Sequence, residues 1–229
     1  MTIQLIVFDL AGTTVKDNKD VHRVLQQALA EDRVAISLDE ANAVMGIPKP
    51  IAIRQLLESR YQGERSITEE WIDEIHKRFV RNMVRFYEED PGVGEKDGVS
   101  DTFAALRKHN IKVFVDTGFD RPVTAPLLKR LGWEERDLID GSVTSDEVRN
   151  GRPYPDMIFE AMRQAGVHDA ARVAKVGDTS SDLQEGNAAG CGLVIGVTSG
   201  AFSADQLRSE EHTHLIQDIP EILEILELK

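Results

Sequence analysis

The chain of 229 residues has one cysteine, no long apolar segment and fewer basic than acidic residues. The single cysteine, Cys191, cannot form a disulfide within the chain, which favours a reducing compartment. No segment approaches the roughly 20 apolar residues that a helix needs to cross a bilayer. No charged leader with a cleavage site precedes the first apolar run. We therefore expect a cytoplasmic protein with no membrane partner.

The shortage of positive charge also restricts the possible ligands. A formal net charge of −13 argues against nonspecific binding to nucleic acid or to anionic membranes. An anionic substrate would need local positive charge, from a metal ion or from a few lysines and arginines that face the site. The chain length suits one α/β core with a modest insertion.

Short, β-branched apolar runs recur along the chain and are typical of buried parallel strands. The clear runs are residues 3–8, 111–115, 172–176 and 193–197, and the weaker ones are 138–143 and 214–217. Helical patterns between them cover residues 100–108, 122–131, 156–165 and 183–189. This alternation predicts an α/β fold with a parallel sheet that is covered by helices on both faces.

The stretch from residue 21 to residue 89 interrupts the alternation and is helical throughout. Trp71, Ile75, Phe79 and Met83 recur every four residues and form one apolar stripe. This stripe packs either within the insertion or against a second subunit in a homodimer. Turn-forming residues near 16–20 and 89–94 mark its ends. We expect a core of residues 1–16 and 92–229 and a helical cap domain of residues 17–91.

Asp9 begins the first of four motifs that carry chemistry. It directly follows a buried strand and precedes the Gly12–Thr13 turn, so its carboxylate should project at the carboxyl edge of the sheet, where ligands bind in open α/β folds. A carboxylate there can attack phosphorus and divide one displacement into two easier steps. The alternative is an aspartate that only caps the turn.

Three further motifs follow other predicted strands. Thr117, before Gly118, can donate its hydroxyl to a phosphoryl oxygen. Arg152 can stabilise the charge that develops during phosphoryl transfer. Asp178 and Asp182 can hold Mg²⁺ directly and through water, because Mg²⁺ prefers one or two carboxylates plus waters and phosphate. Taken singly, a turn, a surface arginine and a helix cap are alternatives.

In this order, the four motifs resemble those of the haloacid dehalogenase superfamily over nearly the whole chain. The resemblance implies a Rossmann-like core with the strand order 3-2-1-4-5-6, a mobile helical cap and transient phosphorylation of Asp9. It also implies Mg²⁺ held by Asp9, the Ala11 carbonyl and Asp178, with Asp182 bound to the metal or linked to it. The implied contacts to a small phosphonate or phosphate ester are Gly12, Thr13, Met45 and Gly118.

Ala11 narrows the reaction. Phosphatases of this superfamily carry an aspartate at this position as general acid and base, and losing such a group lowers a rate about 10²–10⁴-fold. The pattern Asp-x-Ala-Gly-Thr and the arginine at Arg152 resemble the phosphonoacetaldehyde hydrolase (phosphonatase) branch. In that branch a cap lysine forms a Schiff base with an aldehyde, and the leaving group is an enamine carbon that needs no acid at the Ala11 position.

Lys49 matches that cap lysine in the segment Met45-Gly46-Ile47-Pro48-Lys49. Pro50 suits the first position of a helix, so Lys49 should lie at the helix N-terminus, where the helix dipole disfavours a cation. A lysine with a lowered pKa can attack a carbonyl. The alternative is an exposed lysine of the cap surface.

The chain departs from the phosphonatase pattern at three positions. Ala52, Phe119 and Lys19 stand where that family has histidine, tyrosine and cysteine. We expect cleavage of the C–P bond of a 2-oxoalkylphosphonate, and these departures leave the identity of that phosphonate open. The alternatives are a phosphomonoesterase of phosphoglycolate phosphatase type and an inactive protein that only binds a phosphate ligand, since fold alone does not establish activity.

Overall fold

The computed structural model describes residues 2–228 and contains one six-stranded sheet with the order β3-β2-β1-β4-β5-β6. All neighbouring strands are parallel. The strands are β1 (Leu5–Asp9), β2 (Lys112–Thr117), β3 (Gly141–Thr144), β4 (Val173–Gly177), β5 (Leu193–Val197) and β6 (His214–Ile216). The predicted α/β class and strand order are confirmed, and the two weaker apolar runs correspond to the short edge strands β3 and β6.

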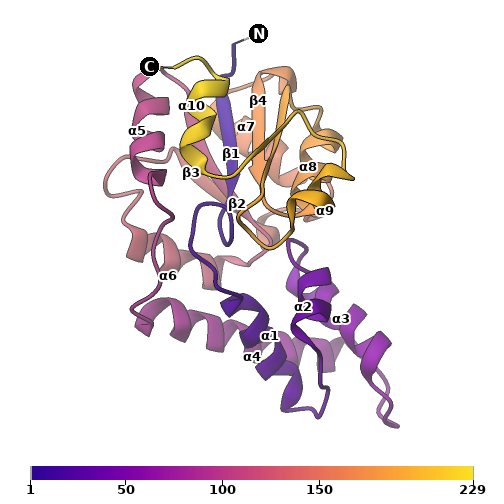
Figure 1. Ribbon diagram of the computed structural model, residues 1–229. Helices are drawn as coiled ribbons and strands as arrows, with labels where there is room; N and C mark the ends of the chain where they lie inside the picture. Colours follow the sequence, from indigo (N-terminus) through magenta and orange to yellow (C-terminus); the bar gives the residue numbers. More distant parts are fainter. Residues whose placement is uncertain (1, 229) are drawn as a thin grey trace.

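Helices cover both faces of the sheet (Figure 1). Ile6 and Phe8 of β1 belong to the apolar cluster that includes α5 and α6, and the Phe8 and Phe103 ring centroids are 4.9 Å apart. Leu5 and Val7 point the other way and pack in a second cluster with α7. This alternation follows from the pleat of a strand. The helices are α5 (Val99–Lys108), α6 (Arg121–Leu131), α7 (Asp156–Ala165), α8 (Ser180–Ala189), α9 (Ala204–Arg208) and α10 (Ile222–Ile225).

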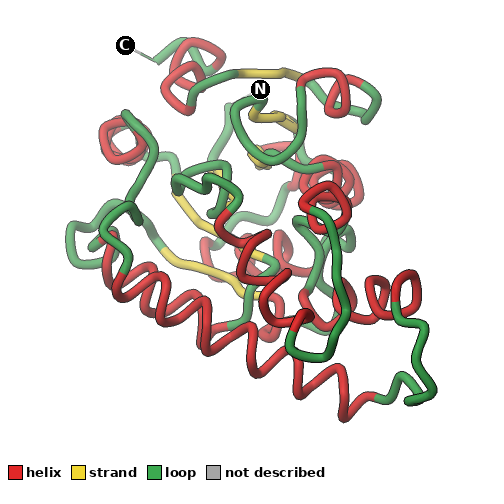
Figure 2. The backbone as a smooth tube through the Cα atoms, turned by 60° about the horizontal axis from the view of Figure 1, so that its bottom comes forward, coloured by secondary structure: helices red, strands yellow, loops and turns green. Residues whose placement is uncertain are grey.

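A helical insertion separates β1 from β2, as predicted. Its helices are α1 (Asp20–Ala30), α2 (Leu38–Ala43), α3 (Lys49–Arg60) and α4 (Glu69–Glu89). They lie beyond the carboxyl ends of the strands, at the bottom of Figure 1, and Figure 2 shows α4 running along the whole insertion. Within residues 2–228, no helix combines the length and the apolar character needed to cross a membrane.

The apolar stripe of α4 is buried inside the chain. Trp71, Ile75, Phe79 and Met83 are all at most 1% exposed, because α1, α3 and α6 pack against this helix. The Trp71 indole nitrogen donates a hydrogen bond to Asp32 Oδ1 at 3.0 Å, which satisfies the polar end of a buried ring. Since these side chains are covered within one chain, the stripe offers no surface to a second subunit.

Replacement of Ile75 by alanine should lower the free energy of unfolding by about 2–5 kcal/mol, the usual result of removing a buried aliphatic side chain. Ile75 is fully buried between α4 and its neighbours. Urea denaturation followed by circular dichroism measures this difference. The matched control is Arg81→Ala on the exposed side of α4, which should stay within about 0.5 kcal/mol of the wild type. Equal losses in both variants would contradict the assignment of the buried face.

The two connections between the sheet and the inserted helices lie side by side. The Lys16 N–H donates to the Gly94 carbonyl at 3.0 Å, and the Lys96 N–H donates to the Thr14 carbonyl at 2.8 Å. Val15 and Glu95 form an antiparallel bridge between these two hydrogen bonds. The outgoing and returning chains are therefore joined to each other as well as to the sheet.

Candidate active site

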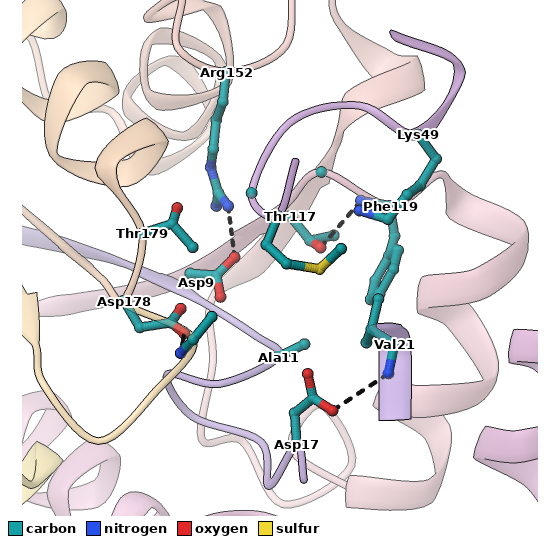
Figure 3. Close-up of a pocket in the computed structure, with 14 residues that line it drawn as sticks. Asp9, Ala11, Asp17, Val21, Lys49, Thr117, Phe119, Arg152, Asp178 and Thr179 are labelled. Atoms are coloured by element: carbon teal, nitrogen blue, oxygen red, sulfur yellow. Dashed lines mark hydrogen bonds and ion pairs between the residues drawn. The ribbon is translucent and has the colours of Figure 1, made fainter. Parts of the chain in front are cut away.

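A pocket lies where the carboxyl edge of the sheet meets the insertion (Figure 3). Both parts of the chain contribute to its wall, since the ends of β1, β2 and β4 face the loop before α3. The lining residues are Asp9, Ala11, Thr117, Gly118, Phe119, Arg152, Asp178, Thr179 and Ala201 from the core, and Asp17, Val21, Met45, Gly46 and Lys49 from the insertion and its first connection.

Most residues selected from the sequence meet at this pocket. The four catalytic candidates that line it are Asp9, Lys49, Thr117 and Arg152, and they are joined there by Ala11, Met45, Gly118 and Asp178. The remaining three candidates, Gly12, Thr13 and Asp182, do not line the pocket. Gly12 and Thr13 lie against Asp178, and Asp182 contacts Arg152.

Asp9 ends β1 and is 5% exposed. Its Oδ1 accepts a hydrogen bond from Arg152 Nη1 at 2.6 Å. Burial raises the pKa of Asp9 to about 8, helped by the negative charges of Asp182 and Asp178 and opposed by Arg152. Additional positive charge in the pocket would therefore stabilise the ionised form of Asp9.

Asp178 follows β4 and is held on both oxygens. Thr13 Oγ1 donates to Asp178 Oδ1 at 2.9 Å, and the Ala201 N–H donates to Oδ2 at 2.6 Å. Gly12 has φ +94°, and a Cβ there would lie 2.3 Å from Asp178 Oδ2, so both the backbone conformation and the close approach require glycine. Burial raises the pKa of Asp178 to about 6, and the charge of Asp182 adds to the effect.

Arg152 is surrounded by four carboxylates and is only 2% exposed. In addition to Asp9, its guanidinium contacts Asp116, Asp182 at 3.0 Å and Glu185 at 2.9 Å. A buried arginine paired on several sides is held in one orientation. The cation predicted from the third motif is therefore fixed beside Asp9 rather than exposed in a surface loop.

Lys175 is the second cation of this cluster, and sequence reasoning missed it. Its Nζ lies 3.0 Å from Glu185 Oε2 and 3.3 Å from Asp182 Oδ1, and it also contacts Asp116. Burial raises the pKa of Glu185 to about 8, with a further contribution from Asp116. A lysine within an otherwise apolar parallel strand was the available signal, because such a residue is rarely buried without charged partners.

Asp9, Asp116 and Asp182 bring three carboxylate oxygens within 4.8 Å of one another, an arrangement that could hold a metal ion. Arg152 and Lys175 already contact Asp116 and Asp182 on that side. Asp9 and Asp178 both line the pocket, and burial raises the pKa of each. The charge of Asp178 adds to the rise at Asp9, so a divalent cation that binds both carboxylates would favour their charged forms.

Lys49 is the first residue of α3 and is 4% exposed. The helix begins one residue before the predicted start, with Pro50 second rather than first. Burial lowers the pKa of Lys49 to about 8, although Asp9 opposes the effect. The Nζ lies 5.9 Å from the Phe79 ring centroid and 5.4 Å from that of Phe119, so aromatic faces border the amine.

Close backbone packing brings the loop before α3 to the sheet edge. A Cβ on Gly118 would lie 2.8 Å from the Gly46 carbonyl oxygen and 3.1 Å from that of Ile47, so only glycine permits this approach. Thr117, just before it, accepts a hydrogen bond from the Phe119 N–H at 3.2 Å. The Thr117 hydroxyl hydrogen therefore stays available to a ligand in the pocket.

These features define a hydrolase centre built around a strand-end carboxylate. The model of the haloacid dehalogenase-like hydrolases matches residues 3–190, and the chain belongs to this family of enzymes. Within the family it resembles the phosphonatases: phosphonoacetaldehyde hydrolase of Bacillus cereus is 30% identical, with 96% of this chain and 86% of that protein covered.

Solved structures agree on the fold. A phosphonoacetaldehyde hydrolase-like protein from Oleispira antarctica has a TM-score of 0.85 at 19% identity, with 99% of this chain and 92% of that chain covered. A predicted phosphoglycolate phosphatase from Haemophilus somnus has a TM-score of 0.83 at 20% identity, with 98% of each chain covered. The two carry different functional descriptions, so the fold does not select the substrate.

Proposed function

We propose that this enzyme cleaves the C–P bond of a 2-oxoalkylphosphonate through a Schiff base on Lys49, with residues 1–16 and 92–229 as the catalytic core and residues 17–91 as the cap. The observation that carries the proposal is that Lys49 and Asp9 line one pocket, while the apolar Ala11 lines it where phosphatases carry an acid. The description of the Bacillus cereus relative as a phosphonoacetaldehyde hydrolase supports it.

The reaction begins at the amine. Neutral Lys49 attacks the substrate carbonyl and, with loss of water, forms an iminium ion. Asp9 then attacks phosphorus, the C–P bond breaks, and its electron pair passes into the iminium to give an enamine. Protonation of the enamine carbon and hydrolysis of the imine release the ketone or aldehyde. Water hydrolyses the aspartyl phosphate and returns the Asp9 carboxylate.

The other pocket residues bind the phosphoryl group and support the carboxylates. Arg152 and the Thr117 hydroxyl face the phosphoryl oxygens and stabilise their charge. Met45 and Gly118 contact the substrate, while Gly12 and Thr13 shape the phosphoryl site through their contacts to Asp178.

Mg²⁺ would be held by Asp9, the Ala11 carbonyl and Asp178 on the pocket side. The raised pKa values of the two aspartates support this placement, because a divalent cation relieves the repulsion between them. Asp182 would support the metal site indirectly, since its Oδ2 accepts hydrogen bonds from the Thr179 N–H at 3.1 Å and from the Thr179 hydroxyl at 2.6 Å. When bound, the ion supplies positive charge to the phosphoryl oxygens.

Borohydride reduction during turnover tests the proposal. Wild-type enzyme is incubated with phosphonoacetaldehyde or 2-oxopropylphosphonate, with Mg²⁺ or with EDTA, and mass spectrometry locates the reduced adduct. We expect an adduct on Lys49 and Mg²⁺-dependent phosphate release. The rate of trapping should rise with pH through about 8, because Lys49 attacks only as the neutral amine and burial lowers its pKa to that value.

The outcomes separate the candidate functions. An unmodified Lys49 with active hydrolysis of phosphate esters would favour the phosphomonoesterase. Absence of Mg²⁺-dependent phosphate release across both phosphonates and phosphate esters would favour a protein that only binds a phosphate ligand.

A further inference from the structure

The proposed imine chemistry needs a proton donor and acceptor, and the three positions that differ from the phosphonatase pattern do not supply one. Ala52 is fully buried in α3, and Phe119 lines the pocket without a titratable group. Lys19 is exposed at the start of α1. The pocket itself contains one carboxyl group, Asp17, to which neither phosphoryl transfer nor metal binding gives a role.

Asp17 lies on the connection into the insertion, and its side chain is only 9% exposed. Its Oδ1 accepts hydrogen bonds from the N–H groups of Asp20 at 2.6 Å and Val21 at 3.3 Å, which fixes the carboxyl group at the start of α1. The carboxyl group reaches the pocket from the wall below Ala11 (Figure 3). Oδ1 therefore caps the helix, and Oδ2 is available to accept or donate a proton.

His22 lies behind this second oxygen. The His22 ring is 2% exposed, and its Nε2 is 2.9 Å from Asn42 Oδ1, so Nε2 carries a hydrogen. Within residues 2–228, the other ring nitrogen, Nδ1, has no hydrogen-bond partner and lies 4.0 Å from Asp17 Oδ2. The second Asp17 oxygen therefore faces a buried ring nitrogen and makes no hydrogen bond to it.

From this geometry, and resting on the proposed function, we infer that Asp17 transfers the protons of imine formation and hydrolysis at Lys49. The Asp17 carboxylate takes the proton from the Lys49 ammonium, and the neutral amine adds to the carbonyl. Asp17 then gives that proton to the carbinolamine hydroxyl, the C–O bond breaks, water leaves, and the iminium remains. Hydrolysis after C–P cleavage reverses these transfers, so that Asp17 again ends as a carboxylate and Lys49 as an ammonium.

Burial favours proton exchange between Asp17 and Lys49. Burial raises the pKa of Asp17, and burial lowers the pKa of Lys49, so the two groups hold a proton with more similar strength than they would in water. The charge of Asp17 acts on Lys49 across the pocket and opposes the effect of burial on the pKa of Lys49. Asp9 and Lys49 line the pocket with Asp17, and the other titratable groups around Asp17 are Asp20, His22, Tyr87 and Lys96.

Asp17→Asn tests the inference because the amide oxygen keeps the cap of α1 while the transferable proton is lost. With 2-oxopropylphosphonate as the probe, borohydride trapping on Lys49 should slow about 10²-fold or more. Hydrolysis of p-nitrophenyl phosphate, which needs no imine, should stay unchanged. The matched control is Asp205→Asn on α9, whose exposed carboxylate pairs with Arg208 at 2.6 Å and should affect neither rate.

These measurements distinguish a proton-transfer role of Asp17 from a structural role. Trapping by Asp17→Asn at the wild-type rate overturns the inference and leaves the imine mechanism in place. A parallel loss of trapping, aryl phosphate hydrolysis and thermal stability also overturns it, because Asp17 would then be structural. No adduct in the wild-type enzyme refutes the proposed function, and the inference with it.

Discussion

Lys49→Arg should reduce C–P bond cleavage by roughly 10⁴-fold or more, the order of loss that follows removal of a covalent nucleophile. Arginine keeps the positive charge, but its guanidinium stays protonated and cannot attack a carbonyl. Lys49 is buried against two aromatic rings, and burial lowers its pKa to about 8, so the native amine is suited to the attack. The measurement is phosphate release from 2-oxopropylphosphonate.

The control for this substitution is Lys77→Arg, since Lys77 is exposed on α4 and pairs with the exposed Asp73 at 2.6 Å. It should keep full activity. If Lys49→Arg kept the activity as well, the lysine would serve only as a positive charge. That outcome would move the enzyme to the phosphomonoesterase class, in which the charge is sufficient.

Asp9→Asn should abolish phosphate release from both phosphonates and aryl phosphates, again by roughly 10⁴-fold or more. The amide cannot form the acyl phosphate, yet it keeps an oxygen for the hydrogen bond from Arg152 Nη1. In the proposed mechanism the imine on Lys49 forms before this step, so borohydride should still label Lys49 in the variant. Quantified adduct and released phosphate therefore separate the two halves of the reaction.

We expect Asp9→Asn to fold as stably as the wild type. Burial raises the pKa of Asp9 to about 8, which means that the folded state resists its ionisation. Between the unfolded pKa near 4 and about pH 8, the wild type binds an extra proton on folding and loses stability as the pH rises. The uncharged asparagine removes that pH-dependent loss. A lower thermal midpoint for Asp9→Asn in EDTA at pH 8 would contradict this reading, and full turnover would refute the assignment of the nucleophile.

The fold was accessible from the sequence because its signals are local. Runs of β-branched residues that end at Asp9 and at Thr117, with helical patterns between them, are enough to place strand ends at one edge. The apolar stripe from Trp71 to Met83 likewise identified the buried face of α4. The start of α3 was predicted one residue late, because the sequence pattern does not distinguish Pro50 at the first helical position from Pro50 at the second.

The missed residues depend on contacts between distant segments. Glu185 is recognisable only once β4 and α8 enclose Arg152, since an isolated charge in a sequence usually lies at the surface, and the position of Lys175 in an apolar strand does not identify its partners. Asp17 looks like a turn residue until the insertion packs over the sheet and places it with Lys49 in one pocket. No spacing rule relates such positions, so only the folded chain shows them.

The paired connections around Val15 and Glu95 have a mechanical consequence. Two independent linkers would let the inserted helices rotate and translate relative to the sheet. Here the two connections are hydrogen-bonded to each other through the Lys16 and Lys96 amides, so we expect them to bend together as one unit. We expect any movement of the inserted helices to be a rotation about the axis of these paired connections. Such a rotation would bring the Lys49 amine back to one position relative to the strand ends.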